Sequence, residues 1–145
     1  MKKKISPYLK DMIDNMDLAQ KFAGNLRFED FIANKEKYYA VLRCVELVGE
    51  AGDRVLKHAP DFEKKHPEVR WDKIIGMRIV MAHHYDKIND QKVWNAIKVS
   101  IPETKSHVEK LYDAVLKEEM MEKEKELDEE QEKSPKKTRG GRLTL

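Results

Sequence analysis

Four residues within one short stretch have side chains that could do chemistry: Arg78, His83, His84 and Tyr85. Histidine exchanges protons near neutral pH, and arginine binds phosphate through its planar guanidinium group. The residues around Arg78 are mostly apolar, and a charge in apolar surroundings requires an anionic partner. That partner is either a carboxylate of the protein or a phosphate from outside. The cluster therefore indicates chemistry of the kind that RNA cleavage or nucleotide binding requires.

The segment from Trp71 to Tyr85 is predicted to be a helix that positions this cluster. At about 3.6 residues per turn Arg78 lies in the middle of an apolar face. On an ideal helix Tyr85 returns to the face of Arg78, whereas His83 lies about 140° away. Arg78 and His83 could share a site if the helix distorts near His83, or if a two-fold symmetric partner contributes its own copies. The apolar residues of this face are Trp71, Ile74, Ile75, Met81, Ala82 and Tyr85.

The rest of the chain is also predicted to be helical, because apolar residues recur at helical spacing and no strand pattern is present. We predict helices over residues 7–23 and 28–58, a short one that opens at Asn89 and ends before Pro102, and a last one from Pro102 onward. Gly49 and Gly52 interrupt the second helix, which indicates that another helix approaches closely there. The predicted fold class is therefore all-α, an antiparallel helical bundle.

Composition predicts one domain over residues 1–117 and a charged C-terminal extension over 118–145. The first part carries a formal net charge of +4 and the second −2. A mildly basic body permits nucleic-acid contact. Residues 118–133 include nine acidic side chains and are either a solvated helix or disordered. The single cysteine, Cys44, excludes an internal disulfide and a cysteine-based metal site. Because no apolar run would span a bilayer, we expect a cytoplasmic protein without a membrane segment.

The spacing Arg78-x4-His83-x-Tyr85 closely resembles the R-x4-H-x-Y motif of the HepT-like branch of the HEPN superfamily, the ribonuclease toxins of HEPN/MNT toxin–antitoxin pairs. The residues around Trp71, Gly76, Trp94 and Pro102, and the Val48-Gly49-Glu50-Ala51 run, also look like this family. The resemblance covers roughly residues 6–116.

The resemblance implies a homodimer whose active site lies in the cleft between the subunits. It also implies a metal-independent endoribonuclease without a cofactor, in which His83 is the general acid and base and Arg78 stabilises the phosphorane. The implied partners are RNA and an MNT-type nucleotidyltransferase antitoxin, which transfers AMP to Tyr85.

One position departs from the family. HEPN ribonucleases usually carry a polar residue directly after the arginine, and here Ile79 stands in that place. His84 could take over the polar role as a second-shell residue. The alternative is a HEPN dimer that binds nucleotide, nucleic acid or its partner protein without cleaving.

Structural roles for the same residues remain open. Arg78 could form an ion pair with Glu46 or Glu50, and His83 and His84 could be ordinary residues at a helix end. Tyr85 could only pack at an interface. We expect no metal at His83, His84 and Asp86, because adjacent histidines on a helix diverge. The apolar face from Trp71 to Ala82 exceeds what a small bundle hides, so we expect a homodimer on this ground as well.

Overall fold

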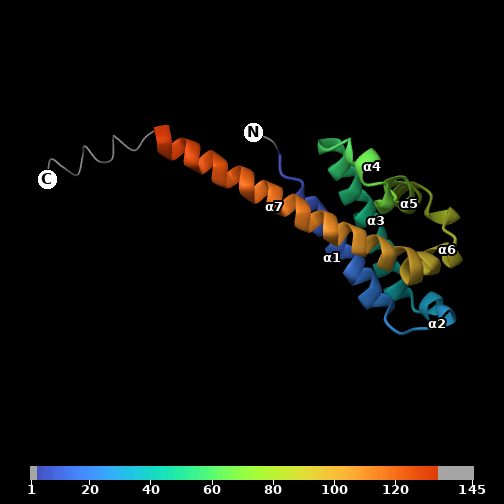
Figure 1. The fold of residues 1–145 in the computed structure, drawn as a ribbon. Helices are drawn as coiled ribbons and strands as arrows, with labels where there is room; N and C mark the ends of the chain where they lie inside the picture. Colours follow the sequence, from blue (N-terminus) through green and yellow to red (C-terminus); the bar gives the residue numbers. More distant parts are fainter. Residues whose placement is uncertain (1–2, 134–145) are drawn as a thin grey trace. The chain divides into compact units, whose positions relative to one another are not determined.

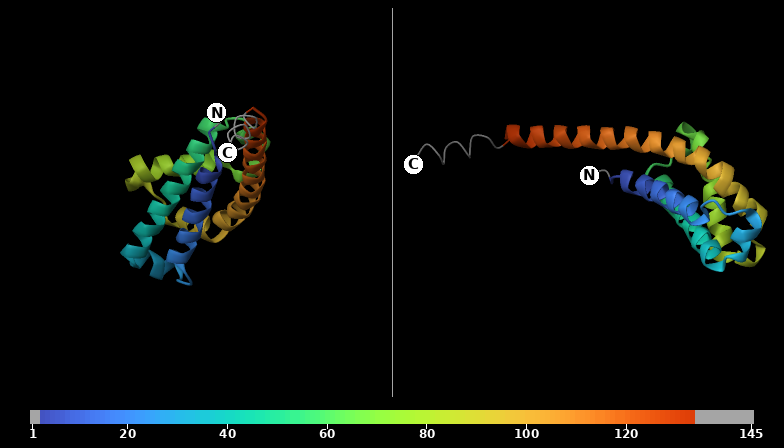
Figure 2. Two further views of the ribbon diagram at one scale, coloured as in Figure 1. Left: turned by 90° about the vertical axis from the view of Figure 1, so that its left-hand side faces the viewer. Right: turned by 90° about the horizontal axis from the view of Figure 1, so that it is seen from below.

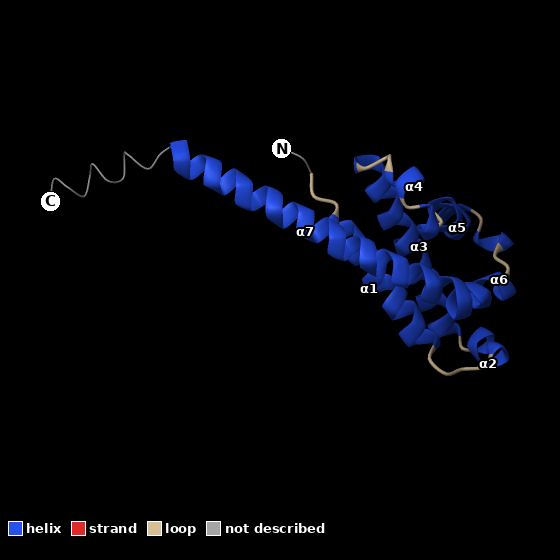
Figure 3. Cartoon of the chain, viewed as in Figure 1, coloured by secondary structure: helices blue, strands red, loops and turns tan. Residues whose placement is uncertain are grey.

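The computed structural model describes residues 3–133, and within them every regular element is helical (Figure 1; Figure 3). This confirms the predicted all-α class. The chain divides into two compact units, residues 1–112 and 113–145. The predicted domain boundary after residue 117 remains a prediction. Residues 3–133 contain no helix with the length and continuous apolar character that a bilayer crossing requires.

Two long antiparallel helices, α1 (Ser6–Ala23) and α3 (Lys35–His58), form the base of the first unit (Figure 2). The α1 helix has the predicted extent and ends at Gly24, whose φ of 55° suits glycine. Its apolar face packs on α3. The buried side chains of this base include Leu9, Met12, Met16, Val41, Val45, Val48 and Val55.

The predicted single helix from Phe28 to His58 is wrong, because the chain breaks at Asn34 into α2 (Phe28–Ala33) and α3. The Asn34 side chain accepts a hydrogen bond from the Lys37 backbone N–H at 3.2 Å, which caps the first turn of α3. The apolar spacing runs through this break, so periodicity alone hides it.

The polar connection between Pro60 and Pro67 contains a short helix, α4 (Phe62–Lys65), and is followed by a 3₁₀ turn, η1 (Pro67–Val69). The helix α5 (Trp71–His83) then begins. Its first residue is an anchor, because Trp71 is fully buried and donates an indole N–H hydrogen bond to the His66 carbonyl at 3.0 Å.

The helix α5 crosses α3 at Gly49. A Cβ atom built on Gly49 would lie 2.5 Å from Arg78 Cβ and 2.7 Å from the Ile74 carbonyl oxygen. The close approach predicted from the glycine pair is therefore confirmed at Gly49. At Gly52 an added Cβ would make only ordinary contacts of 3.5 Å or more, so only Gly49 is required by the crossing.

The prediction that a helix ends before Pro102 is wrong. After a 3₁₀ turn, η2 (Tyr85–Lys87), the chain continues without a break through α6 (Asp90–Asn95), a π-helical turn η3 (Ala96–Ser100) and α7 (Ile101–Lys133). Ile101 keeps right-handed helical angles although it precedes the proline. Because Pro102 has no N–H to donate, the wider π turn lets the helix pass it.

Side-chain contacts attach this last segment to the base of the first unit. Lys105 of α7 forms an ion pair with Asp17 of α1. The Tyr38 hydroxyl donates a hydrogen bond to Asp90 at the start of α6. Burial and this hydrogen bond raise the pKa of Tyr38. These contacts tie α6 and the first turns of α7 to α1 and α3.

The second unit is described over residues 113–133, all within α7. Most side chains of residues 118–133 are exposed. The structure thus describes residues 118–133 as an exposed helix. Residues 134–145 of the predicted extension lie outside the described residues.

Replacing Gly49 with alanine should separate α5 from α3, because the new methyl group meets backbone and Cβ atoms that cannot rotate away. We expect Gly49→Ala to lower the free energy of unfolding by about 1–3 kcal/mol, as over-packing typically does. Urea denaturation measures this change in the free energy of unfolding. The control is Gly52→Ala on the same helix, which should be neutral or slightly stabilising because alanine favours a helix. Equal stability of the two variants would contradict the close crossing.

Candidate active site

Arg78 lies where α5 crosses α3, and the crossing determines its environment. Its backbone and Cβ lie against Gly49, and the side chain is half-buried. The guanidinium Nε is fully buried and has no hydrogen-bond partner. A buried donor without a partner is costly, and in native structures such groups are rare. Arg78 therefore holds an unsatisfied positive group at the surface of the bundle.

The carboxylates that could have neutralised Arg78 are engaged elsewhere. Glu46 pairs with Arg43 at 2.7 Å, and Glu50 pairs with Arg54 at 3.4 Å. Among the described residues no ion pair reaches Arg78. Arg78 thus forms no ion pair with Glu46 or Glu50. Its guanidinium remains available to an anion from outside.

His83 is the last residue of α5, and both it and His84 are exposed. His84 leaves the helix with φ −133° and ψ 39°, although its backbone N–H still donates to the Val80 carbonyl at 2.9 Å. Helical geometry thus holds through His83 and ends only at His84, so a site shared by Arg78 and His83 remains a prediction. Within the described part of the chain, no hydrogen bond joins Arg78 to either histidine.

Tyr85 corrects a geometric prediction. A continuous helix from Trp71 to Tyr85 would return Tyr85 to the face of Arg78, but α5 ends at His83 and Tyr85 begins the turn η2. The prediction that Tyr85 and Arg78 share one helix face is therefore wrong. The motif instead spans a helix, its end and the following turn, with the backbone of Tyr85 two residues beyond His83.

The apolar face predicted for this helix is only partly correct. Trp71 and Met81 are buried within the chain itself, whereas Ala82 is exposed. The large apolar side chains that α5 exposes are Ile79, at 43%, and Val80, at 37%. Ile79 therefore presents an apolar surface directly after the arginine, where the family usually has a polar group.

No cluster of three His, Cys, Asp or Glu side chains suited to a metal ion is found among residues 3–133. The cysteine is buried, and burial raises the pKa of its thiol. The chemical groups that the described site offers are therefore the guanidinium of Arg78 and the imidazoles of His83 and His84. Together they suit binding a phosphate and transferring protons.

Sequence reasoning missed a cavity beside the first two turns of α5. Its polar residues include Arg70, Lys73 and Thr104. Thr104, on α7, is distant in the sequence from Arg70 and Lys73, and no spacing in the sequence indicates that it meets them.

Comparison with known proteins identifies the family. The ribonuclease HepT-like family model matches residues 12–111. A protein of Thermococcus cleftensis named "Probable ribonuclease HepT" is 33% identical over 111 residues, covering 77% of this chain and 98% of that protein. A candidate RNase of Methanocaldococcus jannaschii is 36% identical over 110 residues, covering 76% of this chain and 88% of the relative.

A more distant similarity is to a candidate RNase of Caldanaerobacter subterraneus, 31% identical over 106 residues that cover 72% of this chain and 91% of that protein. No solved structure is significantly similar to this chain. The matched region contains Arg78, His83 and Tyr85, together with the α3–α5 crossing that positions the arginine. The chain therefore belongs to the ribonuclease HepT-like family, which confirms the resemblance indicated by its R-x4-H-x-Y motif.

Proposed function

We propose that this protein is an endoribonuclease that cleaves RNA without a metal ion and acts as the toxin of a toxin–antitoxin pair. The observation that carries the proposal is Arg78, a half-buried arginine whose Nε has no partner within the protein and which stands in the family motif. The names of the relatives, which describe ribonucleases, support the same activity.

The proposed reaction uses the 2′-hydroxyl of the RNA as the nucleophile. A bond forms between this oxygen and the adjacent phosphorus, and the bond from phosphorus to the 5′-oxygen breaks. His83 accepts the proton of the 2′-hydroxyl, and a protonated His83 supplies a proton to the leaving 5′-oxygen. Arg78 stabilises the extra negative charge of the phosphorane. The products are a 2′,3′-cyclic phosphate and a 5′-hydroxyl.

A symmetric homodimer would solve the geometric problem that this reaction poses. One histidine must accept a proton while another donates one, and the chain has a single His83. Two copies related by a two-fold axis would present two Arg78 and two His83 side chains to one cleft. The exposed Ile79 and Val80 on α5 favour such an interface beside the motif.

A second function is favoured by one residue. Ile79 replaces the polar residue that usually follows the arginine, and its side chain is 43% exposed. A dimer that retains the phosphate-binding Arg78 but lacks this polar group would bind nucleotide, nucleic acid or its partner protein without cleaving. The first experiment below separates the two functions.

Purified protein should cleave RNA in the presence of EDTA and leave 2′,3′-cyclic phosphate ends. Arg78→Ala and His83→Ala should each lower the rate by about 10² to 10⁴, because each removes one transition-state interaction. Arg27→Ala, at an exposed arginine of a different element, should cleave like the wild type.

Cleavage that depends on a divalent metal, or that survives in both variants, would contradict the mechanism. RNA binding without cleavage by the wild type, together with cleavage by Ile79→Asn, would support the non-catalytic alternative.

The protein should be a dimer by light scattering at micromolar concentration. Ile79→Glu and Val80→Glu should shift it toward monomer, because each would bury a charge in an apolar interface. Leu18→Glu is the matched control, since Leu18 is 40% exposed on α1 and away from the motif. A monomeric wild type, or equal dissociation by Leu18→Glu, would refute an interface at α5.

We propose that the antitoxin is a nucleotidyltransferase that modifies Tyr85. The tyrosine oxygen attacks the α-phosphate of ATP, the new bond joins this oxygen to AMP, and pyrophosphate leaves. The adduct adds a negative charge and a nucleotide near His83, where it would mimic RNA and block the site.

Co-expression with that partner, followed by intact-mass and peptide mass spectrometry, should find an AMP adduct on Tyr85. The adduct should be absent from Tyr85→Phe and retained in Tyr39→Phe, a control at a tyrosine that is 55% exposed. If the partner neutralised Tyr85→Phe as efficiently as the wild type, AMP transfer to this residue would not be needed.

A further inference from the structure

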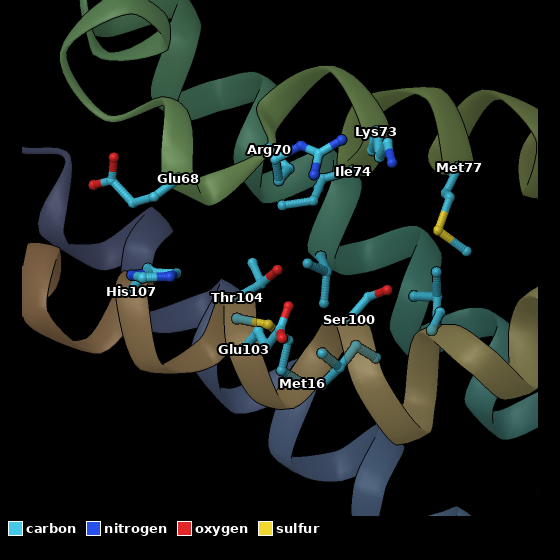
Figure 4. Close-up of a pocket in the computed structure, with 14 residues that line it drawn as sticks. Met16, Glu68, Arg70, Lys73, Ile74, Met77, Ser100, Glu103, Thr104 and His107 are labelled. Carbon is cyan, nitrogen blue, oxygen red and sulfur yellow. The ribbon is translucent and has the colours of Figure 1, made fainter.

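The first unit contains a cavity of about 380 Å³ that the motif does not use. It lies between the first two turns of α5 on one side and η3 with the start of α7 on the other (Figure 4). The helices α1 and α3 contribute its floor. Its volume falls within the ordinary range for small-molecule sites, about 300–1,000 Å³. Arg78, His83 and His84 do not line it.

The apolar part of the lining, on the floor and on both sides, is aliphatic. It consists of side chains that suit a flexible hydrocarbon body, and no Phe, Tyr or Trp is available to stack against a flat base. The apolar lining residues are Met16, Val45, Val48, Ile74, Met77, Ala96 and Ile101.

Thr104 offers the cavity a polar group that a ligand could bind. This residue is 92% buried, and its hydroxyl makes no hydrogen bond with any described residue. Figure 4 shows Thr104 on the α7 side with its oxygen directed into the cavity. Because Arg78 Nε is the one buried side-chain polar atom without a partner among the described residues, the Thr104 oxygen is accessible from the cavity and can bond there to water or to a ligand.

Two cations lie opposite Thr104, at the start of α5. Neither Arg70 nor Lys73 forms an ion pair with a described residue. The lining also contains His107 and two carboxylates: Glu68 pairs with His66 at 3.5 Å, and Glu103 lies on the α7 side. Arg70, Lys73, Glu68 and Glu103 are all exposed. The groups left free on the α5 side are therefore positive, which favours an anion.

The backbone of Arg70 supports a role for its side chain. Arg70 has φ 60° and ψ 49°, which is the left-handed conformation. Among the non-glycine residues within 3–133, it alone has a positive φ. Glycine or asparagine is more favourable there. An arginine at this position, without an ion pair inside the protein, is better explained by a ligand than by local stability.

We propose that this cavity binds a small amphipathic anion, with a carboxylate or phosphate head on an aliphatic body. The head group lies at Arg70 and Lys73 and accepts a hydrogen bond from Thr104. The body packs on Val45, Val48 and Ile101. The ligand would connect the start of α5 to the start of α7.

Isothermal titration of the full-length protein with matched ten-carbon probes tests the two parts of the ligand. Decanoate and decyl phosphate should both bind below their micelle-forming concentrations, and their relative affinities identify the preferred head group. Decanol should bind at least tenfold more weakly because it cannot make charge-assisted hydrogen bonds. Decyltrimethylammonium and acetate should not bind, since one has the wrong charge and the other lacks the body.

Three variants separate ligand binding from folding. Thr104→Val removes the hydroxyl and keeps the shape, so it should lower decanoate affinity about tenfold without loss of thermal stability. Arg70→Asn should also lower decanoate affinity about tenfold. It should keep or raise the melting temperature, because asparagine tolerates the left-handed conformation. Lys73→Gln should weaken binding, whereas Lys21→Gln, the same charge change at an exposed residue of α1, should not.

Equal binding of decanol and decanoate would overturn the proposal. So would wild-type affinity in both Thr104→Val and Arg70→Asn, or no binding of either anion, as expected if a second copy of the chain fills the cavity. RNA cleavage by the same samples is measured separately, so failure of this proposal and failure of the ribonuclease activity are distinguishable.

Discussion

Gly49 lets α5 approach α3 so closely that the Cβ of Arg78 takes the space where a side chain would otherwise stand. This contact fixes the depth and the rotation of α5 on the bundle. The buried Trp71 and its hydrogen bond to the His66 carbonyl fix where the helix begins. Two local constraints thus position a 13-residue helix that would be unstable alone in water. Arg78 owes its half-buried environment to this crossing.

The environment of Arg78 differs from that of two arginines on α3. Arg43 and Arg54 are exposed and pair with Glu46 and Glu50 on their own helix, which contributes little beyond solubility. Arg78 is partly desolvated and its Nε has no partner, yet a guanidinium remains charged in such surroundings. A protein that retains an unsatisfied cation loses stability for it, and such losses are typical of functional sites.

Much of the fold could be predicted from the sequence, because apolar spacing and capping residues are local signals. The extent of α1, the Asn89 cap before α6 and the close approach at Gly49 follow from such signals. The errors arise where a second signal competes. At Asn34 a capping side chain breaks an apolar run, and at Pro102 a π turn preserves a helix that the proline should end. The cavity at Thr104 could not be predicted, since its lining comes from α1, α3, η1, α5, η3 and α7.

The predicted apolar face of α5 was only partly correct for a related reason. This helix has apolar residues on nearly every side, so a single face cannot be assigned from spacing. Packing decides instead: Trp71 and Met81 turn inward, while Ile79 and Val80 stay exposed. The departure at Ile79 then has a physical interpretation. An isoleucine there removes a polar group from the site but extends the apolar surface of Val80. If the proposed dimer forms through α5, the residue that removes a polar group from the motif would also strengthen the interface.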